Sequence, residues 1–192
     1  MVLYISIGCL AFFLMLISDL NKIRQMNGFI NLSFIAGILL LLYSSLMIIL
    51  NDLNNQNWAL WKWGTGILAS LFLILLIYSL FGAIPFKKTY IEAKKNTVVK
   101  TGMYALCRHP GVIWFFFFYF FLALTLSSSL LLRAALVWTS LNIIYVVLQD
   151  YWIFPITLAG YEAYKQEVPF LIPDKNSWQN FAQYYRRKTK WV

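Results

Sequence analysis

Long runs of apolar residues, separated by short polar segments, dominate the pattern of this chain. A helix needs about 20 residues to cross the roughly 30 Å hydrocarbon core of a bilayer, and five of the runs approach or exceed that length. The pattern therefore predicts an all-α fold, a polytopic membrane helical bundle of about five transmembrane helices. We expect these spans over about 2–20, 29–50, 63–84, 110–132 and 134–157.

The ends of the runs carry their own signals. No basic segment precedes the first run and no small-residue cleavage site follows it, so we expect a retained span. Pro85 ends the third run, and Pro110 begins the fourth, where proline is favoured in the first turn of a helix. A turn around Ser127–Arg133 should join the last two spans in a tight hairpin. We expect one membrane domain over 1–192, with a C-terminal segment at 158–192.

Composition agrees with a membrane protein. The chain is 61% hydrophobic and only 12% charged, against roughly 25% charged residues in a soluble domain. The net charge of +9 could indicate nucleic-acid binding, but the basic residues lie between the apolar runs, as in orientation signals. We therefore expect no nucleic-acid partner. Cys9, Cys107 and the single histidine have no spacing typical of a disulfide framework or a metal site, so no metal is expected.

The distribution of basic residues predicts the orientation. Only Lys62 and Arg133 fall on one side of the predicted spans. The positive-inside rule therefore places the N-terminus outside, and the segment 87–109 and the C-terminus in the cytoplasm. The expected cytoplasmic group comprises Lys22, Arg24, Lys87, Lys88, Lys94, Lys95, Lys100, Arg108, Lys165, Lys175, Arg186, Arg187, Lys188 and Lys190.

The C-terminal segment has an amphipathic pattern. Its apolar residues share one helical face, and a basic run over 186–188 follows. This pattern is typical of a helix that lies in the membrane interface and is attracted to anionic lipid. A frayed anchor that only fixes orientation is the alternative. The apolar face comprises Trp178, Phe181, Ala182 and Tyr185.

Arg108-His109-Pro110 stands where a basic loop meets the fourth span. The free N–H groups of a first helical turn favour an anion, and the guanidinium and imidazole add to that preference. The three residues could thus hold a carboxylate or phosphate. The alternative is an orientation anchor, an interfacial histidine and a helix start.

Asp150 is a carboxylate inside the fifth span, about seven residues or roughly 10 Å from its end. Ionisable residues there are costly and usually functional, facing a partner or water. Pro155 should leave the carbonyl of Tyr151 unpaired and open the helix near the acid. With Arg108 and His109 on the neighbouring helix, Asp150 suits a zwitterionic ligand such as S-adenosylmethionine. The alternative is an ion pair of Asp150 with Arg108 or a lysine that only joins two spans.

Two segments resemble a known family. Val98 to Pro110 reads VVKTGMYALCRHP, and Gln149 to Pro173 reads QDYWIFPITLAGYEAYKQEVPFLIP. They are similar to the TGxYxxxRHP and EE…YxxYxxxVPxxxP segments of the isoprenylcysteine carboxyl methyltransferase and phospholipid methyltransferase superfamily. The resemblance covers about the last half of the chain. It implies an integral membrane enzyme that binds S-adenosylmethionine in a cytoplasm-facing pocket of the last spans and the C-terminal segment.

The resemblance also implies a set of site residues. Arg108, His109 and Asp150 would be catalytic, with Arg108 and His109 holding the methionyl carboxylate and Asp150 the ammonium. The cofactor-binding set would be Gly102, Tyr104, Arg108, His109, Gln149, Asp150, Tyr161 and Tyr164.

This chain departs from the family pattern at four positions. Gln149 replaces the first acid of the pair, Val112 stands where tyrosine is frequent, and Trp114 where glycine is frequent. Glu167 takes the place of a frequent basic residue before Val-Pro. These departures weaken an assignment to prenylcysteine carboxyl methylation more than they weaken cofactor binding.

We therefore expect methyl transfer from S-adenosylmethionine to a lipid-borne or prenylated acceptor at the cytoplasmic membrane face, by carboxyl O-methylation or amine N-methylation. The expected partners are this lipophilic acceptor and membrane lipid. Two other classes stay open. One is an NADPH-dependent membrane lipid reductase, because some sterol-type reductases have a related RHP segment. The other is a noncatalytic membrane protein on the same scaffold.

Overall fold

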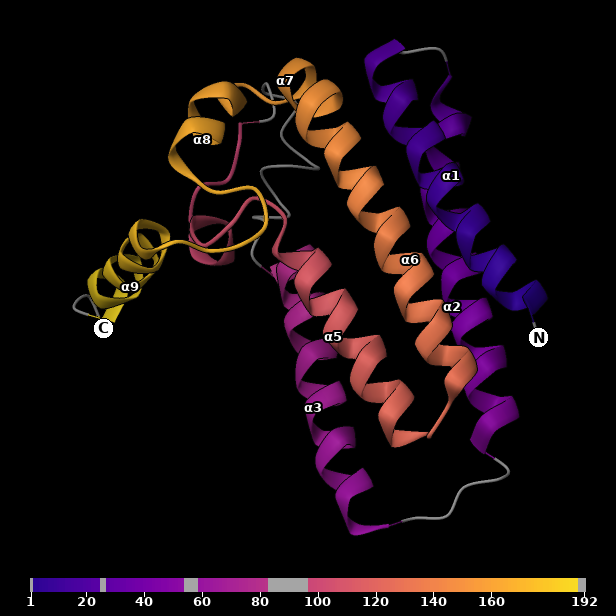
Figure 1. Ribbon diagram of the computed structural model, residues 1–192. Helices are drawn as coiled ribbons and strands as arrows, with labels where there is room; N and C mark the ends of the chain where they lie inside the picture. Colours follow the sequence, from indigo (N-terminus) through magenta and orange to yellow (C-terminus); the bar gives the residue numbers. More distant parts are fainter. Residues whose placement is uncertain (1, 25–26, 54–58, 83–96, 190–192) are drawn as a thin grey trace.

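The computed structural model describes residues 2–24, 27–53, 59–82 and 97–189, and these residues form helices and no β-strand (Figure 1). The protein is an all-α, multi-pass membrane bundle, as the apolar pattern predicts. A fifth, shorter apolar helix covers Pro110–Thr125. The helical segments long and apolar enough to cross a bilayer are Val2–Arg24, Gly28–Leu53, Leu60–Phe81 and Ser129–Thr157.

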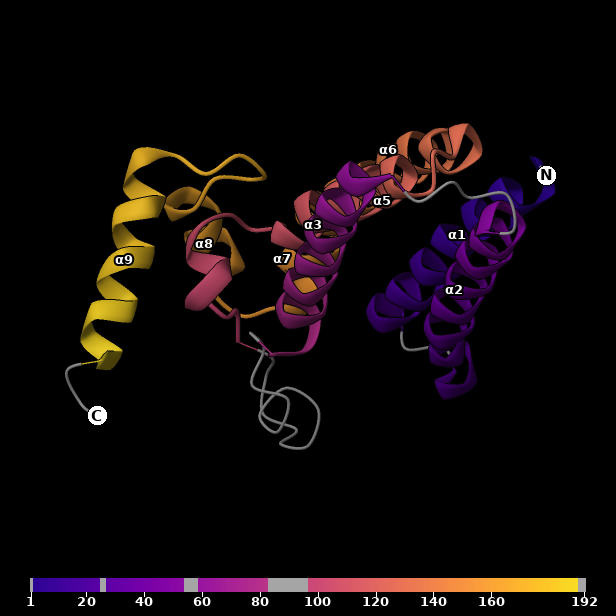
Figure 2. The ribbon, with the colours of Figure 1, turned by 90° about the horizontal axis from the view of Figure 1, so that it is seen from below.

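The bundle is built from two helix pairs and one long helix between them. The antiparallel α1 (Val2–Arg24) and α2 (Leu32–Leu53) form one pair, with η1 (Gly28–Asn31) at their turn. The second pair is α3 (Leu60–Ile77) and α5 (Pro110–Thr125). Figure 2 shows these pairs as separate layers, and α6 (Ser129–Leu148) contacts both α5 and α1.

The first span is longer than predicted, since α1 continues to Arg24 rather than ending near residue 20. The charged residue at this end, Asp19, is buried and its carboxylate is hydrogen-bonded within the bundle. Because the charge is satisfied inside the fold, it does not end the helix. The third span also begins earlier than expected, at Leu60, and continues into the π-helical turn η2 (Tyr78–Gly82); the predicted stop at Pro85 lies outside the described residues.

The tight turn predicted around Ser127–Arg133 is present, but the predicted ends of the two spans it joins are wrong. We expected spans over 110–132 and 134–157, but α5 ends at Thr125 and α6 begins at Ser129. Ser127 has a positive φ of 48°, and the N–H of Ser128 donates to the carbonyl of Ala123, which closes the helix end. The hydroxyl of Ser128 then accepts from the N–H of Leu131 and caps α6. The turn therefore occupies the start of the predicted Ser127–Arg133 segment, and the three leucines after it belong to α6 rather than to the fourth span.

The end of the last span is irregular. The π-helical turn η4 (Gln149–Ile153) follows α6, and α7 (Phe154–Thr157) completes the segment. The N–H of Phe154 donates to the carbonyl of Gln149, five residues back. In the same pattern the backbone nitrogen of Pro155 would donate to the carbonyl of Asp150, but proline has no N–H. The carbonyl of Asp150 therefore has no helical partner in this register, and the ammonium of Lys165 donates to it at 3.5 Å, whereas regular helical spacing predicts a free carbonyl at Tyr151.

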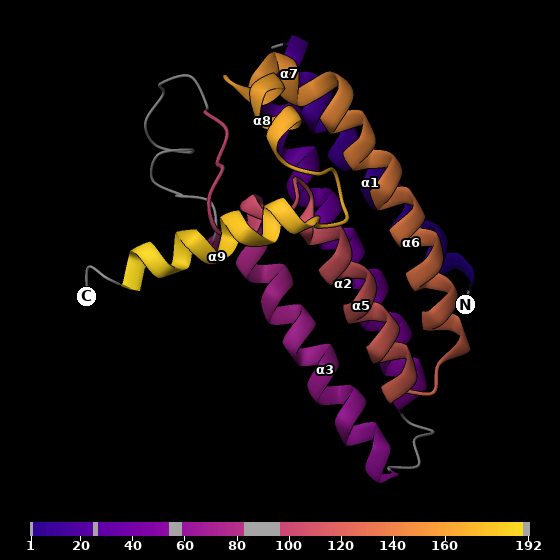
Figure 3. The ribbon, with the colours of Figure 1, turned by 60° about the vertical axis from the view of Figure 1, so that its left-hand side comes forward.

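The chain beyond the spans forms two more helices, α8 (Tyr161–Glu167) and α9 (Lys175–Thr189). Asp174 and Ser177 cap α9 reciprocally, since each backbone N–H donates to the side-chain oxygen of the other residue. Figure 3 shows α9 lying across the direction of α3 and α5. It contacts η3 (Gly102–Ala105), the short helix before α5.

Close packing fixes α6 against α1. Trp138 of α6 is fully buried, and its indole N–H donates to the carbonyl of Ile5, 3.0 Å away. A Cβ at Gly8 would come within 2.3 Å of the Trp138 ring, so only glycine permits this approach. The contact sets the position of α6, and therefore of Asp150 at its far end.

Candidate functional site

The two motif segments lie side by side at one end of the bundle. The N–H of Arg108 donates to the carbonyl of Pro169 at 2.9 Å, and that of His109 to the carbonyl of Phe170 at 3.3 Å. Further out, the N–H of Val98 donates to the carbonyl of Ala159. The backbone thus holds the segment before α5 against the segment after α7, although they are about sixty residues apart.

Asp150 is the centre of the side-chain cluster and is fully buried. Its Oδ1 lies 3.1 Å from Nε of Arg108 and 3.4 Å from Nε2 of His109. The hydroxyl of Tyr161 donates to the same oxygen at 2.6 Å. Four of the predicted site residues therefore meet around one carboxylate oxygen, at the level where α5 begins.

Arg108 joins this cluster to α8. Its side chain is buried, and an N–H of Nη1 donates to the carbonyl of Lys165 at 2.9 Å. The guanidinium also lies over the ring of Phe170. Although Nε is close to Asp150, neither this nitrogen nor Oδ2 of Asp150 makes a hydrogen bond to a described residue. Nε is thus paired with Asp150, and Oδ2 with Lys165, by charge and without a hydrogen bond.

His109 is the residue that precedes α5, and aromatic rings enclose it. Its ring stacks on Phe154 and meets Phe170 edge-on. Burial lowers the pKa of His109 below its usual 6.5, with a smaller contribution from the Arg108 charge, while the hydrogen bond and charge of Asp150 oppose the shift. The imidazole is therefore neutral at pH 7 and can accept a proton.

This lowered pKa predicts a loss of stability on acidification. Below pH 6.5 the unfolded chain takes up a proton on His109 before the folded chain does, so protonation favours unfolding as the pH falls. The thermal denaturation midpoint in detergent should therefore fall between pH 7.5 and pH 5 more steeply for the wild type than for His109→Gln. Parallel pH profiles for the two proteins would contradict the assignment.

The tyrosines of the two motifs are also brought together. The hydroxyl of Tyr164 donates to the carbonyl of Tyr104 at 2.7 Å, and that of Tyr104 to the carbonyl of Ser79 at 3.0 Å. Burial raises the pKa of both Tyr161 and Tyr164, so both stay protonated donors.

Gly102 begins η3 with a φ of +64°, a conformation that strains other residues.

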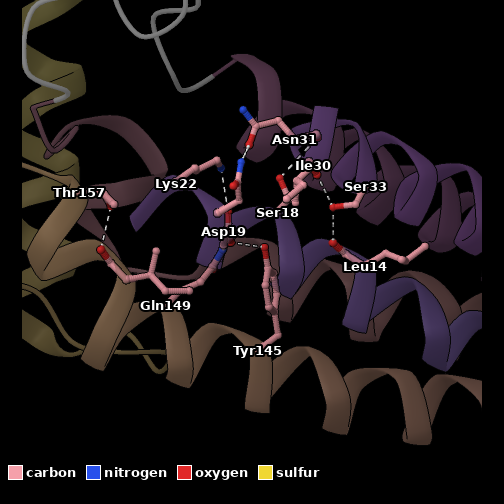
Figure 4. A network of polar contacts seen from close by, with 12 residues as sticks. Leu14, Ser18, Asp19, Lys22, Ile30, Asn31, Ser33, Tyr145, Gln149 and Thr157 are labelled. Carbon is pink, nitrogen blue, oxygen red and sulfur yellow. Dashed lines mark hydrogen bonds and ion pairs between the residues drawn. The ribbon is translucent and has the colours of Figure 1, made fainter. Parts of the chain in front are cut away.

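Gln149 is the predicted site residue that faces elsewhere. Its amide donates to Oδ2 of Asp19 in α1 at 2.7 Å. The hydroxyl of Tyr145 donates to the same oxygen at 2.5 Å, and the ammonium of Lys22 to Oδ1 at 2.7 Å. Figure 4 shows Asp19 between Lys22 on one side and Tyr145 and Gln149 on the other. The adjacent residues Gln149 and Asp150 thus serve two separate polar clusters.

The other departures from the family pattern lie apart from Asp150. Glu167 pairs with Lys100 at 2.9 Å, and both side chains are exposed. Val112 is buried in the apolar core. Trp114 stacks on Phe72 of α3, and its indole N–H, though buried, has no hydrogen-bond partner among the described residues.

Sequence reasoning missed two residues of these clusters. Lys165 lies 3.7 Å from Oδ2 of Asp150, and its place directly after the second motif tyrosine could have drawn attention to it. Asp19 is an acid inside the first apolar run, and that cost alone is a signal of a buried partner. The partners themselves could not be read from the sequence.

Two further observations limit the chemistry. Burial raises the pKa of the Cys107 thiol to about 12, so this cysteine is not a reactive thiolate. The described residues contain no group of three or more His, Cys, Asp or Glu side chains arranged to hold a metal ion.

Comparisons with protein-family models, curated protein sequences and solved structures find no match to this chain.

Proposed function

We propose that this protein transfers a methyl group from S-adenosylmethionine to a lipid-borne or prenylated acceptor at the cytoplasmic membrane face. The observation that supports this most is the meeting of the two motif segments at Asp150. Its carboxylate contacts Arg108 and His109 of one segment and Tyr161 of the other. Such a charged cluster at the end of apolar helices fits an enzyme that joins a polar co-substrate to a lipophilic acceptor.

The atoms without hydrogen bonds fit the head group of this co-substrate. Nε of Arg108 is a buried donor suited to an α-carboxylate, and Oδ2 of Asp150 is a buried acceptor suited to an α-ammonium. The guanidinium of Arg108 and the carboxylate of Asp150 thus offer one positive and one negative group, which suits a zwitterionic head group.

S-adenosylmethionine, when bound, supplies a sulfonium methyl group whose carbon–sulfur bond breaks as the bond to the acceptor forms, with the electron pair left on sulfur. The chain contributes alignment and exclusion of water, worth up to about 7–11 kcal/mol in well-oriented systems. Arg108 and Asp150 would orient the head group. Phe154 and Phe170 would keep water from the imidazole between them. No covalent nucleophile is required.

The acceptor decides whether a base is needed. A carboxylate acceptor is already nucleophilic, whereas an amine acceptor must lose a proton. His109 is held neutral by burial and can take that proton, with Asp150 stabilising the imidazolium that forms. In this reading Arg108, His109 and Asp150 are the catalytic residues.

The proposed orientation follows from where the bundle places its charges. In Figure 1, α1 ends beside α7, and its last turn holds Lys22 and Arg24. The helices α3 and α6 begin at the opposite end, and Lys62 and Arg133 stand close to their first residues. By the positive-inside rule the cluster end faces the cytoplasm and the N-terminus faces outside. Protease protection of tags fused to each terminus in sealed vesicles tests this orientation.

Direct binding is the first test of the proposed function. We expect S-adenosylmethionine and S-adenosylhomocysteine to bind the detergent-purified protein with dissociation constants of roughly micromolar size, about −8 kcal/mol. Isothermal titration calorimetry measures both, with NADPH as a parallel ligand. Glu167→Gln, which alters an exposed ion pair away from Asp150, is the matched control and should leave binding unchanged.

The possible outcomes separate the function classes. Binding of NADPH alone would replace the proposal by a membrane reductase. Binding of none of the three ligands would favour the noncatalytic scaffold, in which Asp150 and Arg108 only join two segments. If the protein binds S-adenosylmethionine but methylates nothing in any lipid extract, it binds the cofactor without being an enzyme.

A further inference from the structure

We propose that the π-helical turn η4 builds a site for an organic cation, such as a methylated ammonium or a sulfonium, which the side chain of Lys165 occupies in the absence of ligand. Its components are Oδ2 of Asp150, the backbone carbonyl of Asp150 and the ring face of Tyr151. The inference deepens the proposed function and rests on it for the identity of the co-substrate: the sulfonium, which has no N–H groups, would lie at Oδ2 of Asp150 in place of the α-ammonium. The cation site can also be tested without that co-substrate.

The π-helical turn creates the backbone part of this site. Because the N–H of Phe154 bonds to the carbonyl of Gln149, the helical register moves back by one residue. Pro155 then offers no proton to the carbonyl of Asp150. A regular α-helix would have used this oxygen for the N–H of Phe154. The freed carbonyl therefore lies beside its own carboxylate as a second acceptor.

The three contacts of Lys165 all suit a cation. Its ammonium lies 3.7 Å from Oδ2 of Asp150 and 3.5 Å from the carbonyl oxygen of Asp150. It also lies 4.1 Å from the centroid of the Tyr151 ring. Carboxylate, carbonyl and aromatic face are together the groups that recognise quaternary ammonium ions. A methylated ammonium or a sulfonium has no N–H groups, so these long distances to the oxygens cost it no hydrogen bond. A lysine ammonium, in contrast, prefers hydrogen bonds shorter than about 3.2 Å.

Exposure shows how a ligand could enter. Asp150 is fully buried, while the side chain of Lys165 is 22% exposed and Tyr151 is 70% exposed. The site is thus closed on the acid side and open on the tyrosine side. The flexible lysine side chain can withdraw toward solvent at little cost, since its charge is readily hydrated.

When the ligand replaces Lys165, both carboxylate oxygens of Asp150 still have a partner. Arg108 and Tyr161 contact Oδ1, whereas Lys165 contacts Oδ2. When Lys165 withdraws, Oδ1 keeps its partners and the entering cation takes over Oδ2. Lys165 therefore competes with the ligand and lowers its affinity, rather than holding it.

The test removes the competing charge. Lys165→Met should bind tetramethylammonium and trimethylsulfonium at least about tenfold more tightly than the wild type, and Lys165→Arg should not. Saturation-transfer NMR of the detergent-purified proteins at fixed ionic strength measures the affinities, with neutral tert-butyl alcohol as the uncharged probe. Lys165→Met/Tyr151→Leu should lose the gain, because it lacks the aromatic face.

The outcomes bear on the cation site and on the proposed function separately. Equal or weaker binding of both cations by Lys165→Met, or equal gains for tert-butyl alcohol, would overturn the cation site. Lys165→Gln, whose neutral side chain also removes the competing charge, must show a gain as well and serves if the methionine variant does not fold. Tight cation binding without any S-adenosylmethionine binding would support the site and reject the methyltransferase.

Discussion

Replacing Asp150 with alanine should lower the free energy of unfolding by about 3–5 kcal/mol and abolish binding of S-adenosylmethionine. The carboxylate is fully buried and is the partner of the Arg108 guanidinium at 3.1 Å. Without it, a buried positive charge remains uncompensated, and the hydroxyl of Tyr161 loses its acceptor. For a chain of this size the loss corresponds to a denaturation midpoint lower by about 10 °C, measurable by thermal denaturation in detergent.

Two further variants separate the stability effect from the binding effect. Asp150→Asn keeps an acceptor for Tyr161 and should lose less stability, yet it should still lose the ligand because the amide does not pair with an ammonium. Arg108→Met combined with Asp150→Leu replaces both charges by apolar groups and should recover most of the stability. It should recover no binding. A folded Asp150→Asn variant with normal affinity would show that Asp150 does not hold the ligand.

Replacing Asp19 with alanine should cost about 3 kcal/mol of stability, because hydrogen bonds to a buried charge contribute about 1.5–3 kcal/mol each and are not additive. The hydroxyl of Tyr145 and the amide of Gln149 both donate to its Oδ2, at 2.5 Å and 2.7 Å. Their loss loosens α1 from α6 beside the π-helical turn. Thermal denaturation in detergent measures the change, and S-adenosylmethionine affinity should fall less than for Asp150→Ala.

The matched control uses the other oxygen of the same carboxylate. Lys22 pairs with Oδ1 of Asp19, but its side chain is half exposed, so Lys22→Ala should cost at most about 1 kcal/mol. Asp19→Asn should lie between the two, since its amide can still bond to Tyr145 and Gln149. If Lys22→Ala were as destabilising as Asp19→Ala, the surface ion pair and not the buried contact with α6 would hold the helices.

The spans could be predicted because a bilayer imposes one requirement on every crossing segment, a sufficient length of apolar residues. Their ends could not, because local hydrogen bonds decide them. The three serines after Leu126 indicate a turn, but not that Ser127 ends one helix and Ser128 caps the next. Asp19 did not end α1, because Tyr145 and Gln149, more than a hundred residues away, donate to its carboxylate inside the bundle.

The candidate site was predictable to the extent that its residues stand in short, ordered motifs. Arg108, His109, Asp150 and Tyr161 meet as the two segments suggested. The sequence could not show that Gln149 faces α1 or that Lys165 returns to Asp150. A π-helical turn shifts the register of the residues after it, and regular helical spacing does not reveal where such a turn forms.

By itself the sequence determined the class of fold, the approximate spans and the asymmetry of charge between the two ends, since these depend on composition along the chain. Only the tertiary structure decided which polar groups are partners. A buried carboxylate must find donors wherever the packing brings them, and Asp150 and Asp19 find theirs on different helices. The packing of α6 on α1, fixed by Trp138 and Gly8, decides on which side each acid lies.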